Sequence, residues 1–240
     1  MAWDGNNISI TKDAPRNYMY GNTVFLLDEI SDYTCAYLIG DLSNFVMNPQ
    51  NAELQLNFII NSPGGDVYTM MTILGLMTIA KINKIKINTF VMGIAASAAS
   101  VIAVQGDVRK ITGVSRHFVH FGAMWSVTER HSEIEKIYQQ TKDYAERIDK
   151  LYLQACPKLT PEVLRNLQLD ERGYLTAEQC LEYGLCDSIV DQDLMLANTL
   201  EEKEEEFTEL FEDYYTGDLT SIITKLTKIN NQKNPLLIKP

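Results

Sequence analysis

The sequence lacks any apolar run of the length that a membrane crossing needs. A transmembrane helix takes about 20 predominantly apolar residues, and polar or charged residues break every apolar run of this chain before about eighteen. Residues 1–21 also lack the apolar core of a secretory signal peptide. We therefore expect a soluble protein with no membrane partner, located in the cytoplasm, in an organelle matrix or stroma, or in the cytoplasm of a phage-infected cell.

Cysteine is scarce and carries no pairing or metal-binding signature. The four cysteines, at positions 35, 156, 180 and 186, show no C-x-x-C spacing. Without a secretory signal, reduced thiols are the expected state. The chain also has no Walker loop, so any ATP-driven step would need a separate ATPase. No metal or other cofactor is expected.

Basic residues are outnumbered by acidic ones. The chain has 21 Lys and Arg against 32 Asp and Glu, a net charge of −11 at pH 7, which disfavours binding to nucleic-acid phosphates. Seven of these eleven charges come from residues 201–213, EEKEEEFTELFED. We interpret residues 191–240 as an acidic helical extension. It is either a solvated helix with a frayed tail or a docking element for a partner, and both alternatives stay open.

Short apolar runs alternate with amphipathic segments along the rest of the chain. The expected strands are residues 24–27, 54–61, 85–92 and 114–122. The expected helices run from a Ser31 cap to 47, over 66–80 and over 128–154, with shorter ones opening at Thr160-Pro161 and at Thr176. This order predicts an α/β fold with parallel strands and helical crossovers. Residues 1–22 are polar and aperiodic, which indicates a loose arm.

The most informative stretch is Thr89–Val101, TFVMGIAASAASV. An apolar run turns at Gly93 into a series of tiny side chains, which places Ser97 at a strand-to-helix bend where backbone N–H groups lack partners. A serine there can be a nucleophile if a base reaches it, because the same N–H groups can stabilise the oxyanion that its attack creates. The alternative is that the small residues serve only close packing of the helix start.

Two further stretches favour the catalytic interpretation. Asn57–Gly65, NFIINSPGG, is a strand that ends in a glycine pair, whose backbone can approach a substrate closely. Val114–Gly122, VSRHFVHFG, is a strand with His120 near its end as a candidate base. His117 lies on the same strand but is expected to face the opposite way. We interpret it, like His131, as structural.

Together these stretches resemble the proteolytic subunit of the Clp protease, the ClpP family. The matching motifs are INSPGG at 60–65, GIAAS at 93–97, SRHFVH at 115–120 and LTA…EYGLCD at 175–187. Four motifs in order at family-like separations make the resemblance specific over about residues 23–190. It implies a ClpP/crotonase-like spiral of β-α-β units with a protruding handle helix.

In terms of domains, the resemblance implies a ClpP-like protease domain over residues 23–190, with the handle at about 121–155. The arm at 1–22 would line an entrance pore, and the extension at 191–240 lies beyond the resemblance.

The resemblance also implies the site of a serine endopeptidase. Ser97 would attack a peptide carbonyl, and His120 would take its proton and later give it to the leaving amine. The N–H groups of Gly65 and Ala98 would hold the oxyanion.

The third member of the triad departs from the family pattern. The family aspartate lies two residues before the aromatic residue that matches Tyr174, and Arg172 stands at that position here. Asp170 or Glu171 could substitute. We select Asp170, because Gly173 lets the chain swivel and bring a carboxylate inward. A third alternative is a Ser97–His120 pair without an acid.

The partners implied are an AAA+ unfoldase ATPase of the ClpX, ClpA or ClpC type, unfolded protein substrates, and a stacked-ring oligomer of this chain or of related subunits. The helix over 128–154 would be about 40 Å long, more than one domain needs for its own face.

Two other functions compete with the peptidase. Arg172 would suit a catalytically weak or inactive subunit of a mixed ring. An acyl-CoA enzyme of the crotonase fold would share the glycine loop but needs no nucleophile, so the pairing of Ser97 with His120 argues against it.

Overall fold

The computed structural model describes residues 16–120, 131–170 and 173–190, with only the backbone described over 131–137. These residues belong to one unit that ends at Val190. The expected extension at 191–240, the first fifteen residues of the arm and residues 121–130 of the handle lie outside the described residues.

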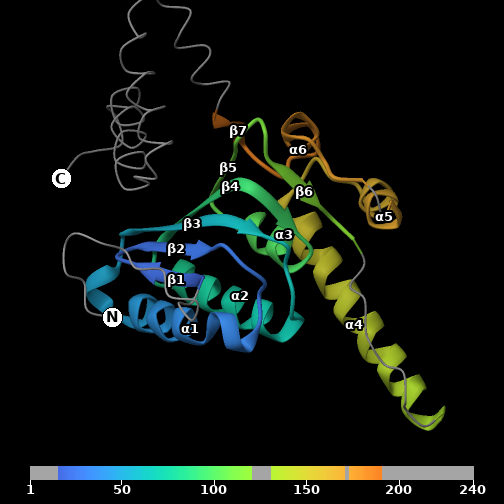
Figure 1. Cartoon of the computed structure of the whole chain (residues 1–240), viewed down its shortest axis with the longest axis horizontal. Coiled ribbons are helices and arrows are strands. Elements are labelled where there is room, and N and C mark those ends of the chain that lie inside the picture. The colour runs from blue at the N-terminus through green and yellow to red at the C-terminus, as the bar shows by residue number, and fades with distance from the viewer. Residues whose placement is uncertain (1–15, 121–130, 171–172, 191–240) are drawn as a thin grey trace, which may run out of the picture. The chain divides into compact units, whose positions relative to one another are not determined.

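A mostly parallel β-sheet organises the described part of the chain (Figure 1). Its strands are β1 (Asn17–Tyr20), β2 (Thr23–Leu26), β3 (Gln55–Ser62), β4 (Lys86–Ala96), β5 (Val108–Ile111), β6 (Arg116–Phe118) and β7 (Ser188–Ile189). The order is β1-β2-β3-β4-β5-β7, and β6 pairs with β4. β1 is antiparallel to β2, and the other pairs are parallel. The predicted α/β fold with parallel strands is confirmed.

Three strands were not predicted. The last part of the expected loose arm, Asn17–Tyr20, forms β1 and is hydrogen-bonded along β2. Asn17 anchors this strand, because its buried side chain accepts hydrogen bonds from the N–H groups of Leu27 and Asp28 and donates one to the Glu29 carbonyl. β5 and β7 are short, and their sequences carry little apolar periodicity.

Four helices begin within one residue of the starts that the sequence predicts. They are α1 (Asp32–Met47), α2 (Val67–Ile82), α3 (Ala98–Ala103), α4 (His131–Ala155), α5 (Pro161–Leu169) and α6 (Ala177–Tyr183), with a 3₁₀ turn, η1 (Pro49–Asn51). Ser31, Asp66, Thr160 and Thr176 each accept a hydrogen bond from an N–H of the first turn that would otherwise lack a partner. The expected starts of the helices after these four residues are confirmed.

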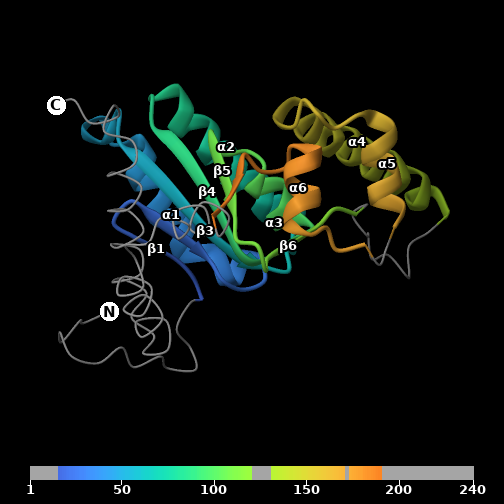
Figure 2. The same ribbon diagram turned by 90° about the horizontal axis from the view of Figure 1, so that it is seen from above.

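The core lies between the sheet and the pair α1 and α2, which run side by side along one face of it (Figures 1 and 2). β3 shows the physical reason: Leu56, Phe58 and Ile60 alternate along the strand, and all three are fully buried. On the helices, Leu38 and Ile73 belong to the same buried cluster. The N-terminal half of α4 projects away from the sheet (Figure 1).

Arg109 of β5 joins the last elements of the unit to the sheet. Its guanidinium donates to both carboxylate oxygens of Asp187 and, at 2.9 Å each, to the carbonyl oxygens of Ala155 and Gly184. The side chain is 12% exposed. It therefore satisfies carbonyls at the C-terminal ends of α4 and α6, where a positive charge is favoured.

Replacing Arg109 by Met is expected to lower the free energy of unfolding by about 3 kcal/mol. The reason is that two carbonyl groups and Asp187, which is 44% exposed, would lose one cationic partner together. Chemical denaturation would measure the change. The control is Arg165→Met on the exposed side of α5, which should change stability by no more than about 0.5 kcal/mol. Equal effects of the two variants would contradict the role given to Arg109.

Candidate active site

The three motif segments meet at one edge of the sheet. β3, β4 and β6 are parallel neighbours, with Ser62 paired to Ala95 and Ala96 paired to Phe118. The carboxyl ends of these strands therefore lie together, and each motif follows directly after one of them. The glycine pair comes after β3, Ser97 after β4 and His120 after β6. The fold thus gathers segments that are up to 60 residues apart in sequence, as the sequence resemblance implies.

Ser97 occupies a backbone conformation that few non-glycine residues adopt. Its φ and ψ are 55° and −125°, between the end of β4 and the start of α3. Such conformations cost about 1–3 kcal/mol and persist only where the surroundings hold them, most often at functional sites. Its N–H donates to the Phe118 carbonyl and its carbonyl accepts from Ser100, both at 3.0 Å. Its side chain makes no capping bond to α3, so the hydroxyl is not used to satisfy its own helix.

The loop that contains Gly64 and Gly65 packs against the bend at Ser97. Their φ angles are +89° and +147°, values that suit glycine alone. A Cβ on Gly64 would lie 2.7 Å from the Ser97 Cβ and 2.8 Å from the Ala98 nitrogen, and one on Gly65 would meet the Ile30 carbonyl. The absence of side chains is what lets the two backbones approach each other.

Two backbone N–H groups at this point, those of Gly65 and Ala98, were assigned to the oxyanion by the sequence resemblance. Ile30 forms hydrogen bonds to the residues on both sides of Gly65. Its N–H donates to the Gly64 carbonyl and its carbonyl accepts from the Asp66 N–H, each at 2.7 Å. Because strand-like backbone alternates the direction of its groups, the N–H of Gly65 points away from Ile30. Ala98 is the first residue of α3, so its N–H has no acceptor within the helix. These are the two donors that the sequence resemblance assigned.

His120 follows β6 and is half-buried. Its imidazole stacks on Phe118 at 5.1 Å between ring centroids, and Phe118 stacks in turn on Tyr174 at 4.9 Å. The histidine makes no hydrogen bond to Ser97 in this structure. Without a bound substrate, such bonds are often long and form only in the complex. Nothing in the sequence pattern marks the aromatic stack in advance, because Phe118 and Tyr174 are 56 residues apart.

The segment after the expected acid is anchored to β6. Leu175 exchanges two backbone hydrogen bonds with His117 at 3.1 and 2.7 Å, which fixes the chain after Tyr174 against β6. Asp170 ends α5, is exposed, and its carbonyl accepts from the Gly173 N–H at 3.0 Å. Glu171 and Arg172 lie outside the described residues.

His117, unlike the half-buried His120, lies in the interior. It is 1% exposed, and its Nδ1 lies 2.9 Å from the Ser100 hydroxyl. Burial, and secondarily the nearby positive charge of Arg109, lower the pKa of His117 from 6.5 to about 4. The ring is therefore uncharged at neutral pH, as expected of a structural histidine. The side chain of His131 lies outside the described part.

Stability is expected to fall as the pH is lowered from about 6.5 to about 4. In this window the unfolded chain binds a proton at His117 and the native chain does not, so protons favour unfolding; below about 4 the loss reaches about 3 kcal/mol. Denaturation at a series of pH values would measure it. In a His117→Asn variant, which can still accept from Ser100, this part of the pH dependence should vanish. A variant with the wild-type profile would contradict the assignment.

Comparison with known proteins identifies the family. The model of the Clp protease family matches residues 11–193, well over half of the chain. The chain belongs to the Clp protease family. A curated relative, the ATP-dependent Clp protease proteolytic subunit of Deinococcus radiodurans, is 26% identical over 149 residues, which cover 61% of this chain and 70% of the relative.

The match to the Clp protease family covers the fold and the site together. It includes all four motifs and every described strand and helix. Clp proteases are peptidases, so the family supports hydrolysis of peptide bonds over the acyl-CoA chemistry that the crotonase-type fold also allows. Residues 194–240 lie beyond the match.

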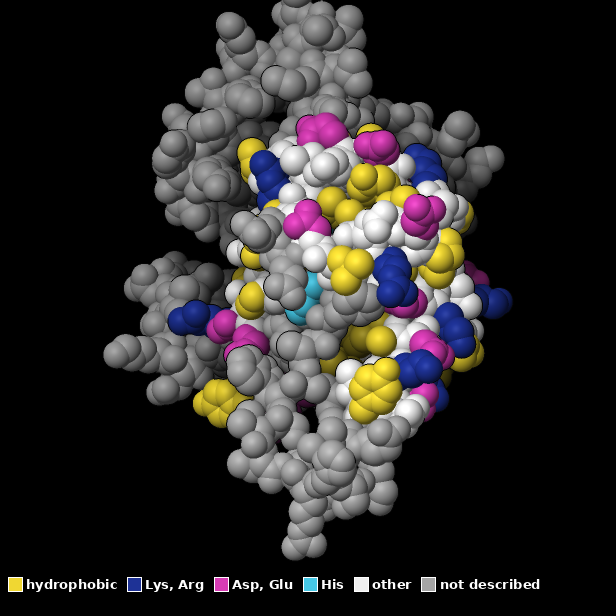
Figure 3. Space-filling view, turned by 90° about the vertical axis from the view of Figure 1, so that its right-hand side faces the viewer, with side chains coloured by type: hydrophobic (Ala, Val, Ile, Leu, Met, Phe, Trp, Pro, Cys, Tyr) yellow, Lys and Arg dark blue, Asp and Glu magenta, His cyan; other side chains and the backbone are white. Residues whose placement is uncertain are grey.

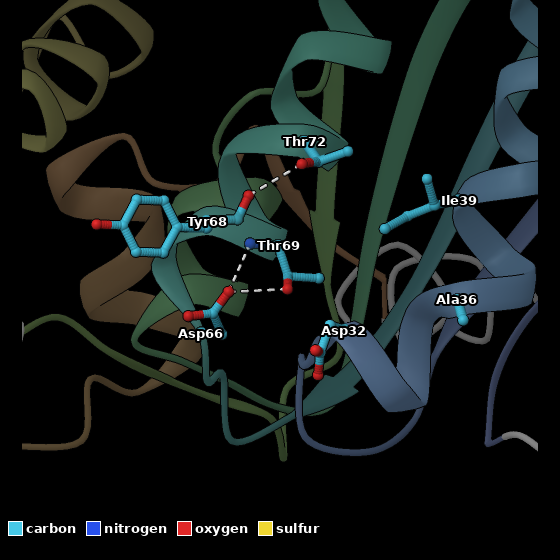
Figure 4. Close-up of a pocket in the computed structure, with 7 residues that line it drawn as sticks. All are labelled: Asp32, Ala36, Ile39, Asp66, Tyr68, Thr69 and Thr72. Atoms are coloured by element: carbon cyan, nitrogen blue, oxygen red, sulfur yellow. Dashed lines mark hydrogen bonds between the residues drawn. The ribbon is translucent and has the colours of Figure 1, made fainter.

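A hollow of about 620 Å³ on this Clp protease chain opens between the N-terminal turns of α1 and α2 (Figure 4). Asp66, which follows the glycine pair, faces it but uses its carboxylate to cap α2 through the N–H and hydroxyl of Thr69, at 2.7 and 2.8 Å. Neither Ser97 nor His120 lines this hollow.

The described residues also bear on membranes and metals. None of their helices combines the length and apolar character needed to cross a bilayer. Within the same residues, no three His, Cys, Asp or Glu side chains are grouped as metal ligands.

Proposed function

We propose that this Clp protease family member is a serine endopeptidase subunit. It would hydrolyse peptide bonds of unfolded proteins delivered by a separate AAA+ unfoldase ATPase of the ClpX, ClpA or ClpC type. The observation that carries the proposal is the strained bend at Ser97, with φ 55° and ψ −125°, at the edge where the three motif-bearing strands end. Strain of this kind is maintained where exposing a nucleophile requires it.

In this proposal Ser97 Oγ attacks the carbonyl carbon of the substrate while His120 takes the serine proton. The N–H groups of Gly65 and Ala98 hold the oxyanion of the tetrahedral intermediate, and each donor in such a pair is worth about 10²–10³ in turnover. His120 then gives the proton to the leaving amine. Water releases the acyl group from Ser97 with His120 again as base. Asp170 is proposed to orient the imidazole and to support its charge.

We propose further that the chain assembles into stacked rings. α4 has 25 residues, or about 37 Å at 1.5 Å per residue, and its N-terminal half projects from the sheet (Figure 1). Tyr138 on that half is 61% exposed, whereas Tyr152 near the other end is 2% exposed. A projecting helix with an exposed aromatic side chain such as Tyr138 is suited to contact another subunit. On the face in Figure 3, acidic and basic side chains are interspersed, which favours a protein contact over nucleic acid.

Light scattering at neutral pH is expected to report a large closed oligomer for the whole chain. The physical reason is that a helix of this length leaves exposed aromatic surface that a monomer cannot cover. A monodisperse monomer would contradict the ring proposal and would leave the peptidase proposal without its assembled state.

The function is tested by hydrolysis of a fluorogenic peptide with the assembled protein. Wild type is expected to turn the peptide over, and Ser97→Ala to lower turnover by several orders of magnitude while the oligomer is unchanged. Alanine keeps the size of the bend residue, so loss of activity without loss of assembly points to the hydroxyl. Hydrolysis that survives in Ser97→Ala would overturn the role of Ser97. An assembled wild type with no hydrolysis would instead indicate an inactive subunit of a mixed ring.

A further inference from the structure

Three buried polar side chains form a continuous hydrogen-bonded chain behind the candidate site. The Tyr152 hydroxyl donates to Ser100 Oγ at 2.9 Å, and Ser100 Oγ lies 2.9 Å from Nδ1 of His117. Their exposed fractions are 2%, 0% and 1%. They come from α4, α3 and β6, at sequence separations of 52 and 17 residues. Burying three polar groups costs free energy unless every group is satisfied, so apolar packing would be the simpler way to fill this space.

The first hydrogen bond of this chain has a direction, because the Tyr152 hydroxyl donates to Ser100 Oγ. The direction of the second follows the tautomer of His117, since Ser100 Oγ can donate to Nδ1 or accept from Nδ1–H. The His117 ring is uncharged, as argued above. The charged group that acts on His117 is Arg109, whose guanidinium forms an ion pair with Asp187. Removing the Tyr152 hydroxyl would leave Ser100 with a single partner and freedom to rotate.

The same elements hold both candidate catalytic residues. Ser100 is three residues after Ser97 and bonds to its carbonyl, while His117 is three residues before His120. Phe118 lies between the histidines, accepts from the Ser97 N–H and stacks on the His120 ring. α3 and β6 are therefore joined twice, by the backbone bond at Ser97 and by the side-chain bond from Ser100 to His117. α3 has only six residues, so its own hydrogen bonds do little to fix its position.

We propose that Tyr152, Ser100 and His117 are positioning residues, whose buried relay holds α3 against β6 and so sets Ser97 relative to His120. The inference rests on the proposed function of Ser97 and His120. Through Tyr152 the relay also ties the site to α4, the projecting helix. Misplacement of a catalytic pair by about 1 Å can lower the rate about a hundredfold.

The test uses Tyr152→Phe, which removes one oxygen and keeps the ring, in the whole assembled protein. Turnover of the fluorogenic peptide is expected to fall about ten- to a hundredfold with little change in KM. The matched control is Ile73→Val, which is equally buried but lies on α2 outside the relay. It should lower the unfolding midpoint by a similar small amount and leave turnover unchanged. Equal turnover in the two variants would overturn the proposal.

A second readout does not depend on activity. Mass spectrometry measures deuterium exchange at the imidazole carbon between the two nitrogens for each histidine over a range of pH. In Tyr152→Phe, exchange at His120 is expected to change as well as exchange at His117, although Tyr152 bonds to neither ring. A change confined to His117 would mean that the relay does not affect the position of His120, which would contradict the proposal. If Tyr152→Phe does not fold, Ser100→Ala takes its place. A wild-type protein that hydrolyses no peptide would contradict the proposed function. Deuterium exchange at His120 would still test whether the relay positions α3 against β6.

Discussion

Replacing Gly64 by alanine is expected to abolish peptidase activity and to lower the free energy of unfolding by about 3 kcal/mol. The added Cβ would lie 2.7 Å from the Ser97 Cβ and 2.8 Å from the Ala98 nitrogen, and it would also meet the Ala96 carbonyl. Two of these three contacts are backbone atoms, so the relief must come from moving the bend itself. The φ of +89° adds strain for any residue with a side chain.

Gly75→Ala is the matched control. Gly75 lies in the middle of α2, and a Cβ there would meet nothing within 4 Å. Because glycine is a poor helix former, the change should raise the free energy of unfolding by about 0.5–1 kcal/mol and leave turnover unaltered. Peptide hydrolysis and chemical denaturation measure both variants. An active Gly64→Ala would contradict the close approach of the glycine loop to Ser97.

The second large effect concerns the acid. Asp170→Asn is expected to leave the fold intact and to lower turnover by about three to four orders of magnitude, because the His120 imidazole would lose its preferred tautomer and the support of its charge. The wild-type and variant rates of peptide hydrolysis measure this effect. Glu162→Gln, an exposed carboxylate in the first turn of α5, serves as the control and should change little.

Two companion variants separate the alternatives for the third member. If Glu171 supplies the acid, Glu171→Gln should lose activity and Asp170→Asn should not. Arg172→Asp restores an acid at the position that matches the family aspartate and should raise the rate if that position faces His120. If neither single variant nor the double variant changes turnover beyond a few-fold, the acid assignment is wrong. The site would then work, if at all, through Ser97 and His120 alone.

Much of the fold could be predicted from local chemistry. Ser31 is a favoured N-cap residue, and Thr176 with Gln179 has the sequence of a capping box, so both mark helix starts without any knowledge of the fold. The alternation of apolar residues along β3 is also a local pattern, so it predicts the strand from the sequence alone. β1 is different, because its sequence NYMY is stabilised by distant contacts such as those of Asn17 with Leu27 and Glu29. Local patterns do not carry that information.

Some features of the candidate site could likewise be predicted from neighbouring residues, and others depend on tertiary packing. Ser97 could be placed at a bend because Gly93 and the small residues around it are neighbours in sequence. The relay could not be predicted, since Tyr152 fits the apolar stripe of its helix and Ser100 fits a run of small residues. Only the packing of α4 against α3 shows that their hydroxyls meet. The third acid stays a prediction, because Glu171 and Arg172 lie outside the described residues.

The central claim, that Ser97 is the nucleophile, is tested most directly by covalent labelling. The assembled protein would be treated with a fluorophosphonate probe, and the adduct would be mapped by mass spectrometry. A single adduct on Ser97 is expected, absent from Ser97→Ala. Ser100, which is fully buried, should remain unlabelled. Labelling at another residue, or no labelling of an assembled sample, would contradict the account.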